Sequence, residues 1–164
     1  MQPERIEPGP GQESVWDYPR PPRLERTGHR LVVVFNGVTI ADSTKAYRVL
    51  ETSQPPAYYL PPRDVALEHL DRSTTATFCE WKGSATHHSV TVNGRSSADA
   101  AWSYVRPTDR FADIADYLAF YPRRVDECYV DDELVQPMEG SFYGGWITAK
   151  IVGPFKGGAG TAHW

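Results

Sequence analysis

Lys82 is the residue of this sequence whose neighbours best suit chemistry. It stands in the run Cys79-Glu80-Trp81-Lys82-Gly83, beside a large ring and directly before a glycine. A lysine held against apolar walls loses hydration, so its pKa falls and its amine can act as a base or nucleophile. The same side chain can instead stay charged and hold an anionic group. A third interpretation is a lysine whose stem covers Trp81 while its ammonium remains in water.

Two adjacent histidines, His87 and His88, follow a few residues later. Neighbouring side chains on a strand point to opposite faces, so only one of the two can enter a given pocket. For the same reason they cannot bind one metal ion together. We take Lys82, His88 and Tyr121 as the candidate catalytic residues, with His88 or Tyr121 as the acid beside Lys82. A purely structural role for either histidine stays open.

No recognised metal-binding or phosphate-binding motif accompanies these residues. The sequence lacks Cys-x-x-Cys, His-Glu-x-x-His and an EF-hand loop, so we predict neither a metal site nor a cofactor. Cys79, one of the histidines and Asp126 supply the residue types of a catalytic relay, but no spacing rule supports it. The run Gly153–Gly160 has neither a Walker nor a dinucleotide-binding pattern, and we interpret it as structural.

Aromatic side chains follow in two further segments. In Ala101-Trp102-Ser103-Tyr104, alternation on a strand would place Trp102 and Tyr104 on the same face. Phe120-Tyr121-Pro122 adds two more rings. Two rings on one face form the wall either of a core or of a pocket. The surrounding segment 98–105 is compatible with both helix and strand.

The composition limits the class of protein. The chain has 164 residues, enough for one domain whose core needs no metal or disulfide. A formal net charge of −4 and the lack of a basic stripe argue against nucleic-acid binding. Two cysteines are too few for a disulfide framework, and no apolar run is long enough for a secretory signal or a membrane span. We therefore predict a cytoplasmic protein with two reduced, buried thiols, and one Cys79–Cys128 disulfide stays open as the alternative.

Short β-branched or alternating runs dominate the sequence and predict a mostly β fold. Asn36-Gly37 separates two such runs and Asn93-Gly94 follows another, and this pair favours a hairpin turn because both turn positions need positive φ. Two short helices are expected, one after Arg63 and one between residues 107 and 118. About eight short strands are expected, at 31–35, 38–40, 46–51, 57–60, 74–80, 86–92, 117–121 and 125–130.

The two terminal segments differ in composition from the centre. Residues 1–28 hold six of the fourteen prolines and many charges, which predicts an arm that is either disordered or pinned by Trp16 and Tyr18. Residues 137–164 hold seven of the thirteen glycines together with spaced aromatic anchors. We expect this tail to wrap the domain rather than fray, and we place the folded domain itself at 29–136.

Four separated segments resemble the DUF427 family. Residues 77–85 match its central signature, Thr-x-Cys-(Pro or Glu)-Trp-Lys-Gly-x-Ala. A Tyr-Tyr-x-Pro segment before a short helix is matched at 58–70, and an Asp-Ala-Ala-Trp-x-Tyr run at 99–104. An Ala-Phe-Tyr run that ends in Val-Asp is matched at 119–126. Order and spacing agree over roughly residues 30–130, and the Gly-Gly-Trp-Ile of the tail resembles actinobacterial members.

The resemblance implies a β-tent (Mss4-like) fold of antiparallel sheets, similar to Mss4 and methionine sulfoxide reductase B. Relatives of that fold hold zinc with two Cys-x-x-Cys knuckles, which this chain lacks, so no knuckle zinc is expected. Many family members carry aromatic residues in place of His87-His88, which implies a different ligand preference here. Several β-tent proteins bind ligands on an aromatic sheet face, and by analogy the candidate ligand-binding residues are Tyr59, Trp81, Lys82, His88, Trp102 and Tyr121.

Three functional hypotheses follow. The first is a domain that binds a small polar or anionic ligand in an aromatic pocket around Lys82. The second is a small-molecule enzyme that uses Lys82 as a base or Schiff-base nucleophile. The third is a structural motif on a surface that meets a protein partner. The family has also been labelled a nucleotidyltransferase, but that chemistry needs metal-holding carboxylates, usually an Asp-x-Asp pair, and this chain has no such pair.

Overall fold

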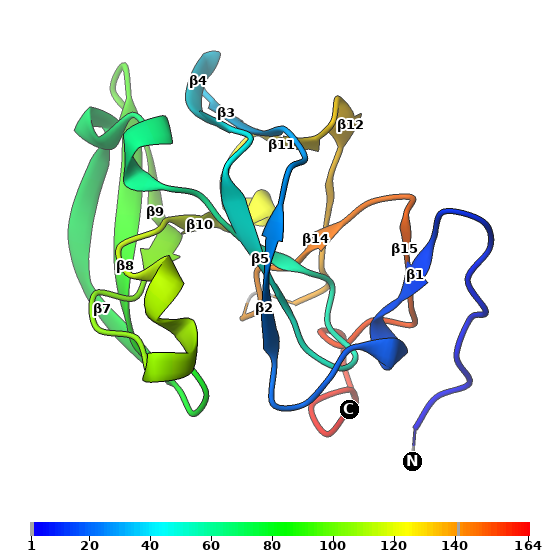
Figure 1. Cartoon of the computed structure of the whole chain (residues 1–164). Helices are drawn as coiled ribbons and strands as arrows, with labels where there is room; N and C mark the ends of the chain where they lie inside the picture. The colour runs from blue at the N-terminus through cyan, green and yellow to red at the C-terminus, as the bar shows by residue number, and fades with distance from the viewer. Residues whose placement is uncertain (1, 141) are drawn as a thin grey trace.

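Antiparallel sheets and short 3-10 helices make up the computed structural model, which describes residues 2–140 and 142–164. Within these residues the strands form three larger sheets and two two-stranded ones, and no α-helix occurs. Figure 1 shows the sheets arranged side by side from the green strands at the left to the orange strands at the right. The predicted mostly β fold class is confirmed.

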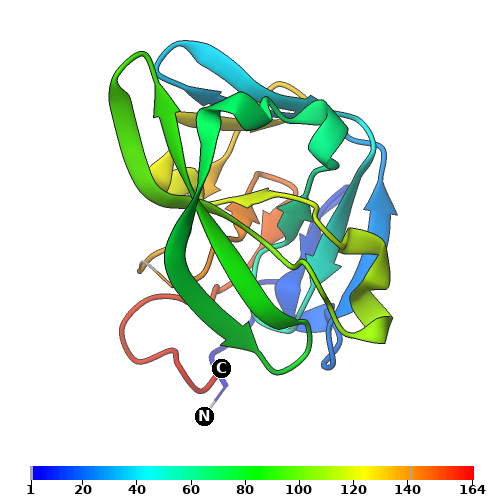
Figure 2. The same cartoon turned by 90° about the vertical axis from the view of Figure 1, so that its left-hand side faces the viewer.

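The first sheet supplies one wall of the candidate site. It runs in the order β10-β9-β8-β7, and each neighbouring pair is antiparallel. Most of the segment 98–105, which was compatible with both helix and strand, therefore belongs to strand β9. Figure 2 shows this sheet facing the viewer, with the outer strand β7 exposed over most of its length. Its strands are β7 (Leu70–Cys79), β8 (Gly83–Val92), β9 (Arg95–Ser103) and β10 (Ala119–Phe120).

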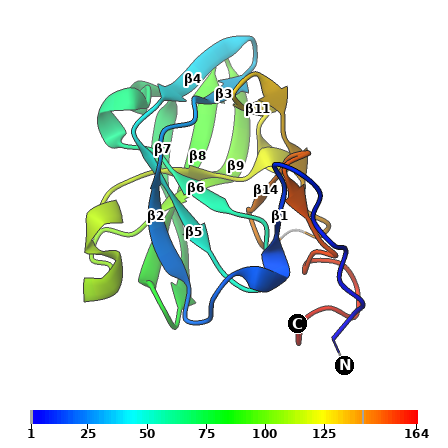
Figure 3. The same ribbon diagram turned by 45° about the vertical axis from the view of Figure 1, so that its right-hand side comes forward.

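Two further sheets follow the first, in the orders β12-β11-β3-β4 and β2-β5-β6. The backbones of Leu60 and Leu118 exchange two hydrogen bonds of 2.8 and 2.9 Å, which tie the end of β6 to the segment before β10. Figure 3 shows β3, β4 and β11 above the crossing of β2 and β5. The strands are β2 (Arg23–Thr27), β3 (Leu31–Phe35), β4 (Val38–Ser43), β5 (Ala46–Leu50), β6 (Ala57–Tyr59), β11 (Glu127–Val130) and β12 (Glu133–Leu134).

The two terminal segments pair with each other and with the rest of the chain. Strand β1 (Glu13–Ser14) is parallel to β15 (Ile151–Val152), and β13 (Gln136–Pro137) is antiparallel to β14 (Trp146–Ile147). Both termini lie at the same lower corner of the molecule in Figure 1. The last residues of the predicted arm form β2, so the segment 1–28 is not irregular throughout.

The two predicted short helices are 3-10 turns. In the first region the chain forms η2, which contains Arg63, and then η3, and Ala66 between them has non-helical φ −76° and ψ 81°. In the second region η4 has a non-helical residue, Phe111, with φ −111° and ψ 18°. The five 3-10 helices in the described residues are η1 (Val15–Asp17), η2 (Pro62–Asp64), η3 (Leu67–His69), η4 (Asp109–Ile114) and η5 (Pro122–Arg124).

Both Asn-Gly pairs form the hairpin turns that the sequence predicts. Asn36 and Gly37 have φ of 48° and 76° between β3 and β4, and Asn93 and Gly94 have φ of 49° and 82° between β8 and β9. Positive φ at both central residues gives the turn a twist that matches the flanking strands. These two turns set the register of the residues next to them, and a bulge shifts the register farther along each hairpin, between Val33 and Val34 in the first and between His88 and Val90 in the second.

Trp146 of the tail belongs to the main hydrophobic core. Its side chain is fully buried, and its ring centroid lies 5.1 Å from that of Tyr58. Its indole Nε1 donates to the carbonyl oxygen of Phe120 at 3.0 Å, and its backbone N–H donates to the carbonyl of Pro56 at 2.8 Å. Trp146 therefore connects the tail both to β10, through Phe120, and to the segment just before β6, through Pro56.

Trp146→Ala tests whether the tail stabilises the whole domain. Truncation of a fully buried tryptophan typically costs about 3–5 kcal/mol, so we expect the free energy of unfolding in urea to fall by that amount. Leu134→Ala is the matched control, because Leu134 is 55% exposed and should change stability by less than about 0.5 kcal/mol. Equal stability of Trp146→Ala and the wild-type protein would mean that the tail is dispensable for folding.

Candidate functional site

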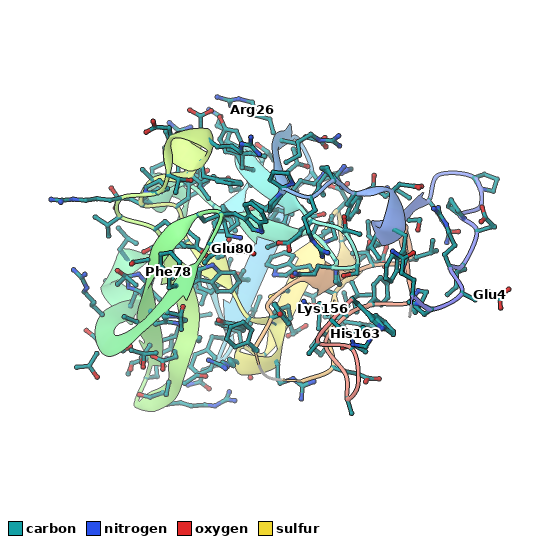
Figure 4. All side chains as sticks on the ribbon, turned by 90° about the horizontal axis from the view of Figure 1, so that it is seen from below. Glu4, Arg26, Phe78, Glu80, Lys156 and His163 are labelled. Carbon is teal, nitrogen blue, oxygen red and sulfur yellow. The ribbon has the colours of Figure 1, made fainter. Side chains whose placement is uncertain are left out.

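A cavity of about 590 Å³ lies between the first sheet and the β5–β6 side of the third sheet. Its walls come from β7, β8 and β9, from the segment around Tyr59, and from the tail near Tyr143 and Lys156. Figure 4 shows Phe78 and Glu80 beside β7 and Lys156 on the tail, all on the face seen from below. The cavity is therefore formed by segments from far apart in the sequence.

Five of the six predicted ligand-binding residues line this cavity. They are Tyr59, Trp81, Lys82, Trp102 and Tyr121. The sixth, His88, is not among the lining residues; its neighbour His87 is. His88 instead places Nε2 2.9 Å from the hydroxyl of Ser103. As alternation on a strand requires, one histidine of the pair faces the cavity, and it is His87 and not the predicted His88.

Strand register explains why His87 faces the cavity. In the first sheet His87 pairs directly with Trp102, and Thr77 pairs with Ala85. Directly opposed residues point to the same face, as do residues two apart on one strand. Trp102 and Tyr104 are therefore on that face, as their spacing predicts, and both line the cavity.

Lys82 is held at the turn between β7 and β8. The hydroxyl of Thr108 donates to the carbonyl of Trp81 at 2.6 Å, and the backbone N–H of Thr108 donates to the carbonyl of Lys82 at 3.0 Å. The ammonium of Lys82 lies 5.9 Å from the ring centroids of both Tyr104 and Phe111. It thus rests against these two rings, with its backbone fixed by Thr108.

The ammonium of Lys82 is favoured in its charged form. Burial by itself lowers the pKa of Lys82, but the neighbouring Tyr59, Cys79 and Glu51 outweigh burial and raise the pKa above its ordinary value. At neutral pH Lys82 is therefore a cation in a ring-lined cavity and not a free amine.

The aromatic floor of the cavity is a hydrogen-bonded group of rings. The indole Nε1 of Trp102 donates to the hydroxyl of Tyr59 at 3.2 Å, and the two rings meet edge to face at 6.0 Å. Burial raises the pKa of Tyr59 and of Tyr104. Both phenols are consequently neutral near Lys82.

Tyr121 and His87 continue the floor away from Lys82. The ring of Tyr121 lies 4.5 Å from Trp102 and 6.4 Å from His87, nearly parallel to the imidazole. The guanidinium of Arg124 covers Tyr121 at 4.2 Å. Burial raises the pKa of the Tyr121 phenol, which keeps it protonated at neutral pH.

His87 is neutral, and only one of its two ring nitrogens has a hydrogen-bond partner among the described residues. Its Nε2 lies 2.9 Å from the hydroxyl of Thr77, while its buried Nδ1 has no hydrogen-bond partner among the described residues. Burial lowers the pKa of His87. A neutral imidazole of this kind can donate to or accept from a polar group, depending on its tautomer.

The tail closes the cavity at a pair of glycines. A Cβ on Gly144 would come within 2.5 Å of the Trp102 ring and 3.0 Å of Tyr121. A Cβ on Gly145 would meet the carbonyl oxygen of Pro55 at 2.5 Å. Only glycine lets the chain pass this close to the aromatic floor. These glycines are not among the predicted site residues, although two adjacent glycines beside a tryptophan are a sequence cue for close backbone approach.

Other groups that line the cavity are also not among the predicted site residues. Asp99 lines the cavity from a bulge of β9, where it has φ of 51° and accepts from the hydroxyl of Thr75 at 2.7 Å. No periodicity rule reveals such a bulge in advance. Both cysteines are free, Cys128 buried and Cys79 half-buried on the cavity wall. Asp126 pairs instead with Arg95 at 2.8 Å, so the relay with Cys79 is not formed.

Two further properties concern the part of the chain that the structure describes. No three histidine, cysteine, aspartate or glutamate side chains come together there in a way that could hold a metal ion. Among its helices, none has the length and apolar character that crossing a membrane requires.

The fold and cavity define a mostly β protein with an aromatic pocket around a cationic lysine. Residues 23–131 match the model of a family described as a domain of unknown function (DUF427), and the chain belongs to this family. The match includes the four segments that resemble the family and most of the cavity wall, but ends before the tail glycines. No curated protein matches the chain.

Gly144→Ala tests the contact between the tail and the aromatic floor. Overpacking of this kind typically costs about 1–3 kcal/mol, so we expect a loss of that size in the free energy of unfolding, with an altered fluorescence of Trp102. Gly28→Ala is the matched control, because a Cβ there meets nothing within 4 Å. The contact is absent in solution if both variants are equally stable.

Proposed function

We propose that this protein binds a small organic anion, with the acidic group at Lys82 and an aromatic or planar body against the rings of the cavity. The observation that carries the proposal is the charged ammonium of Lys82 inside a ring-lined cavity of about 590 Å³. Cavities of roughly 300–1,000 Å³ with a few polar groups suit small-molecule ligands.

The charge of Lys82 supports an anionic ligand. No carboxylate of the described residues forms a salt bridge with its ammonium. A half-buried charge without a paired counter-ion loses hydration without full compensation. A ligand carboxylate or phosphate at this position would supply that compensation.

The rings support a planar ligand body. Trp102, Tyr121 and Tyr59 present a continuous aromatic surface that starts near Lys82 and extends to His87. Offset and edge-to-face ring contacts contribute roughly 0.5–1.5 kcal/mol beyond burial. His87 lies at the far end, where its unpaired Nδ1 suits a second polar group of the ligand.

The state of Lys82 favours binding over base or Schiff-base chemistry. A lysine base or nucleophile must be deprotonated for a substantial fraction of the time, which requires a lowered pKa. Here the pKa of Lys82 is raised. Lys82 therefore suits electrostatic recognition better than proton abstraction.

Matched pairs of acids and amides test the proposal by thermal shift. We expect benzoate, indole-3-acetate or phenyl phosphate to raise Tm, and benzamide or indole-3-acetamide not to. At 100 times its Kd a ligand adds ~2.7 kcal/mol, which for a chain of this size is a rise of roughly 5–10 °C. Nucleotides with and without Mg²⁺ belong in the same screen.

Two variants make the screen specific for the cavity. Lys82→Met should lose the shift produced by the acids, since it removes the cation but keeps an unbranched apolar stem. Lys45→Met, at an exposed lysine outside the cavity wall, should keep it. Equal shifts with acids and amides, or a shift that survives in Lys82→Met, would contradict the proposal.

A further inference from the structure

A second lysine, Lys156 of the tail, lines the same cavity, and the proposed function leaves it unused. Its side chain is half-buried, and its ammonium lies 5.1 Å from the ring centroid of Tyr143, which is also part of the cavity wall. Figure 4 shows Lys156 on the tail and Glu80 at the turn that carries Lys82, on the same face of the molecule. The cavity therefore receives one ammonium from the first sheet and one from the tail.

The backbone around Lys156 is held in place by the rest of the tail. Its N–H donates to the carbonyl of Ser53 at 2.8 Å. The next residue, Gly157, has φ of 136°, and a Cβ there would meet the carbonyl oxygen of Glu139 at 2.5 Å. The N–H of Gly157 donates to the hydroxyl of Thr161 at 2.9 Å. These contacts limit where the Lys156 ammonium can lie.

Lys156 is better placed than Arg124 to meet an acid of a ligand. Arg124, which also lines the cavity, covers the ring of Tyr121 and donates from Nη1 to the carbonyl of Asp99 at 2.8 Å. No carboxylate in the described part of the chain forms a salt bridge with Lys156. A ring contact stabilises an ammonium on one side only, and its three N–H donors can still serve an anion.

Three carboxylates line the cavity as well, but none of them forms a salt bridge with Lys82 or Lys156. Glu51 faces Arg20 at 3.7 Å, and Asp99 accepts from the hydroxyl of Thr75 at 2.7 Å. The third, Glu80, is exposed. Both ammonium groups are therefore available to the acids of a ligand.

We propose that the ligand carries two acidic groups, one held by Lys82 and the other by Lys156, and is a planar aromatic dianion such as an aromatic dicarboxylate. The inference rests on the proposed function, because Lys82 must hold the first acid. Once that acid is bound, the second contact forms within the complex and adds affinity without a second loss of translational freedom. Lys156 thereby selects dianions over monoanions.

The two lysines differ in their relation to the family. Lys82 lies within residues 23–131, which match the family model, whereas Lys156 lies beyond them. The tail thus adds a second cation to a cavity whose wall comes mostly from the matched segment. In this arrangement Lys82 anchors the ligand and Lys156 determines its specificity.

Terephthalate and its monoamide form a matched pair of probes, because they share one ring and one acid and differ in the charge of the second group. A biphenyl dicarboxylate and its monoamide repeat the comparison at greater length. The Kd of each probe is measured by isothermal titration calorimetry on the full chain. The Kd of the monoamide divided by that of the dicarboxylate gives the preference for the second acid, and a preference of about 2 arises merely because either acid of a dicarboxylate can occupy the Lys82 site.

We expect a preference of at least about tenfold for one of the two lengths, which corresponds to ~1.4 kcal/mol. Lys156→Met should reduce it to the statistical value while the Kd of the monoamide stays unchanged. Lys156→Arg keeps the charge and should retain most of the preference. Lys45→Met is the matched control and should leave every Kd as in the wild-type protein, whereas Lys82→Met should weaken both probes of each pair.

The outcomes separate this inference from the proposed function. If the monoamides bind in a manner that depends on Lys82 but the preference is only statistical at both lengths, the second acid site alone is refuted. A large preference that survives in Lys156→Met also refutes it, because another group then meets the second acid. If none of the four probes binds, or if Lys82→Met changes no Kd, the proposed function fails as well.

Discussion

The candidate site depends on one physical constraint: the ammonium of Lys82 must stay charged although it is half-buried. Tyr104 and Phe111 give the ammonium of Lys82 aromatic faces at 5.9 Å, and the negative parts of those faces attract it. Tyr59, Cys79 and Glu51 raise its pKa further. None of these contacts is a salt bridge, so the cation is stabilised but still able to accept an anionic partner.

The rest of the fold serves to place this charge at the end of an aromatic surface. The hairpin of β7 and β8 sets Lys82, while the pairing of β8 with β9 sets Trp102 opposite His87. The backbone link between Leu60 and Leu118 brings Tyr59 under the same cavity. Gly144 then lets the tail cover the floor in direct contact with Trp102.

Local patterns in the sequence predict the parts of this arrangement that depend on neighbouring residues. Alternation places Trp102 and Tyr104 together, and the Asn-Gly pairs give both hairpin turns. The choice between His87 and His88 could not be made from sequence, because it depends on the register of β8 with β9. Long-range contacts were equally hidden: the bulge at Asp99 and the approach of Gly144 to Trp102 arise from segments that meet only in the folded chain. The β-tent assignment remains a prediction from resemblance.

The most direct test of the central claim is the pKa of Lys82 measured by ¹⁵N NMR of the lysine ammonium groups, with the resonance assigned by its loss in Lys82→Met. We expect a pKa above the ordinary value of ~10.4 and a resonance that moves when benzoate is added but not when benzamide is added. A pKa of Lys82 below about 8 would contradict it, because such values belong to lysines that act as neutral bases or nucleophiles.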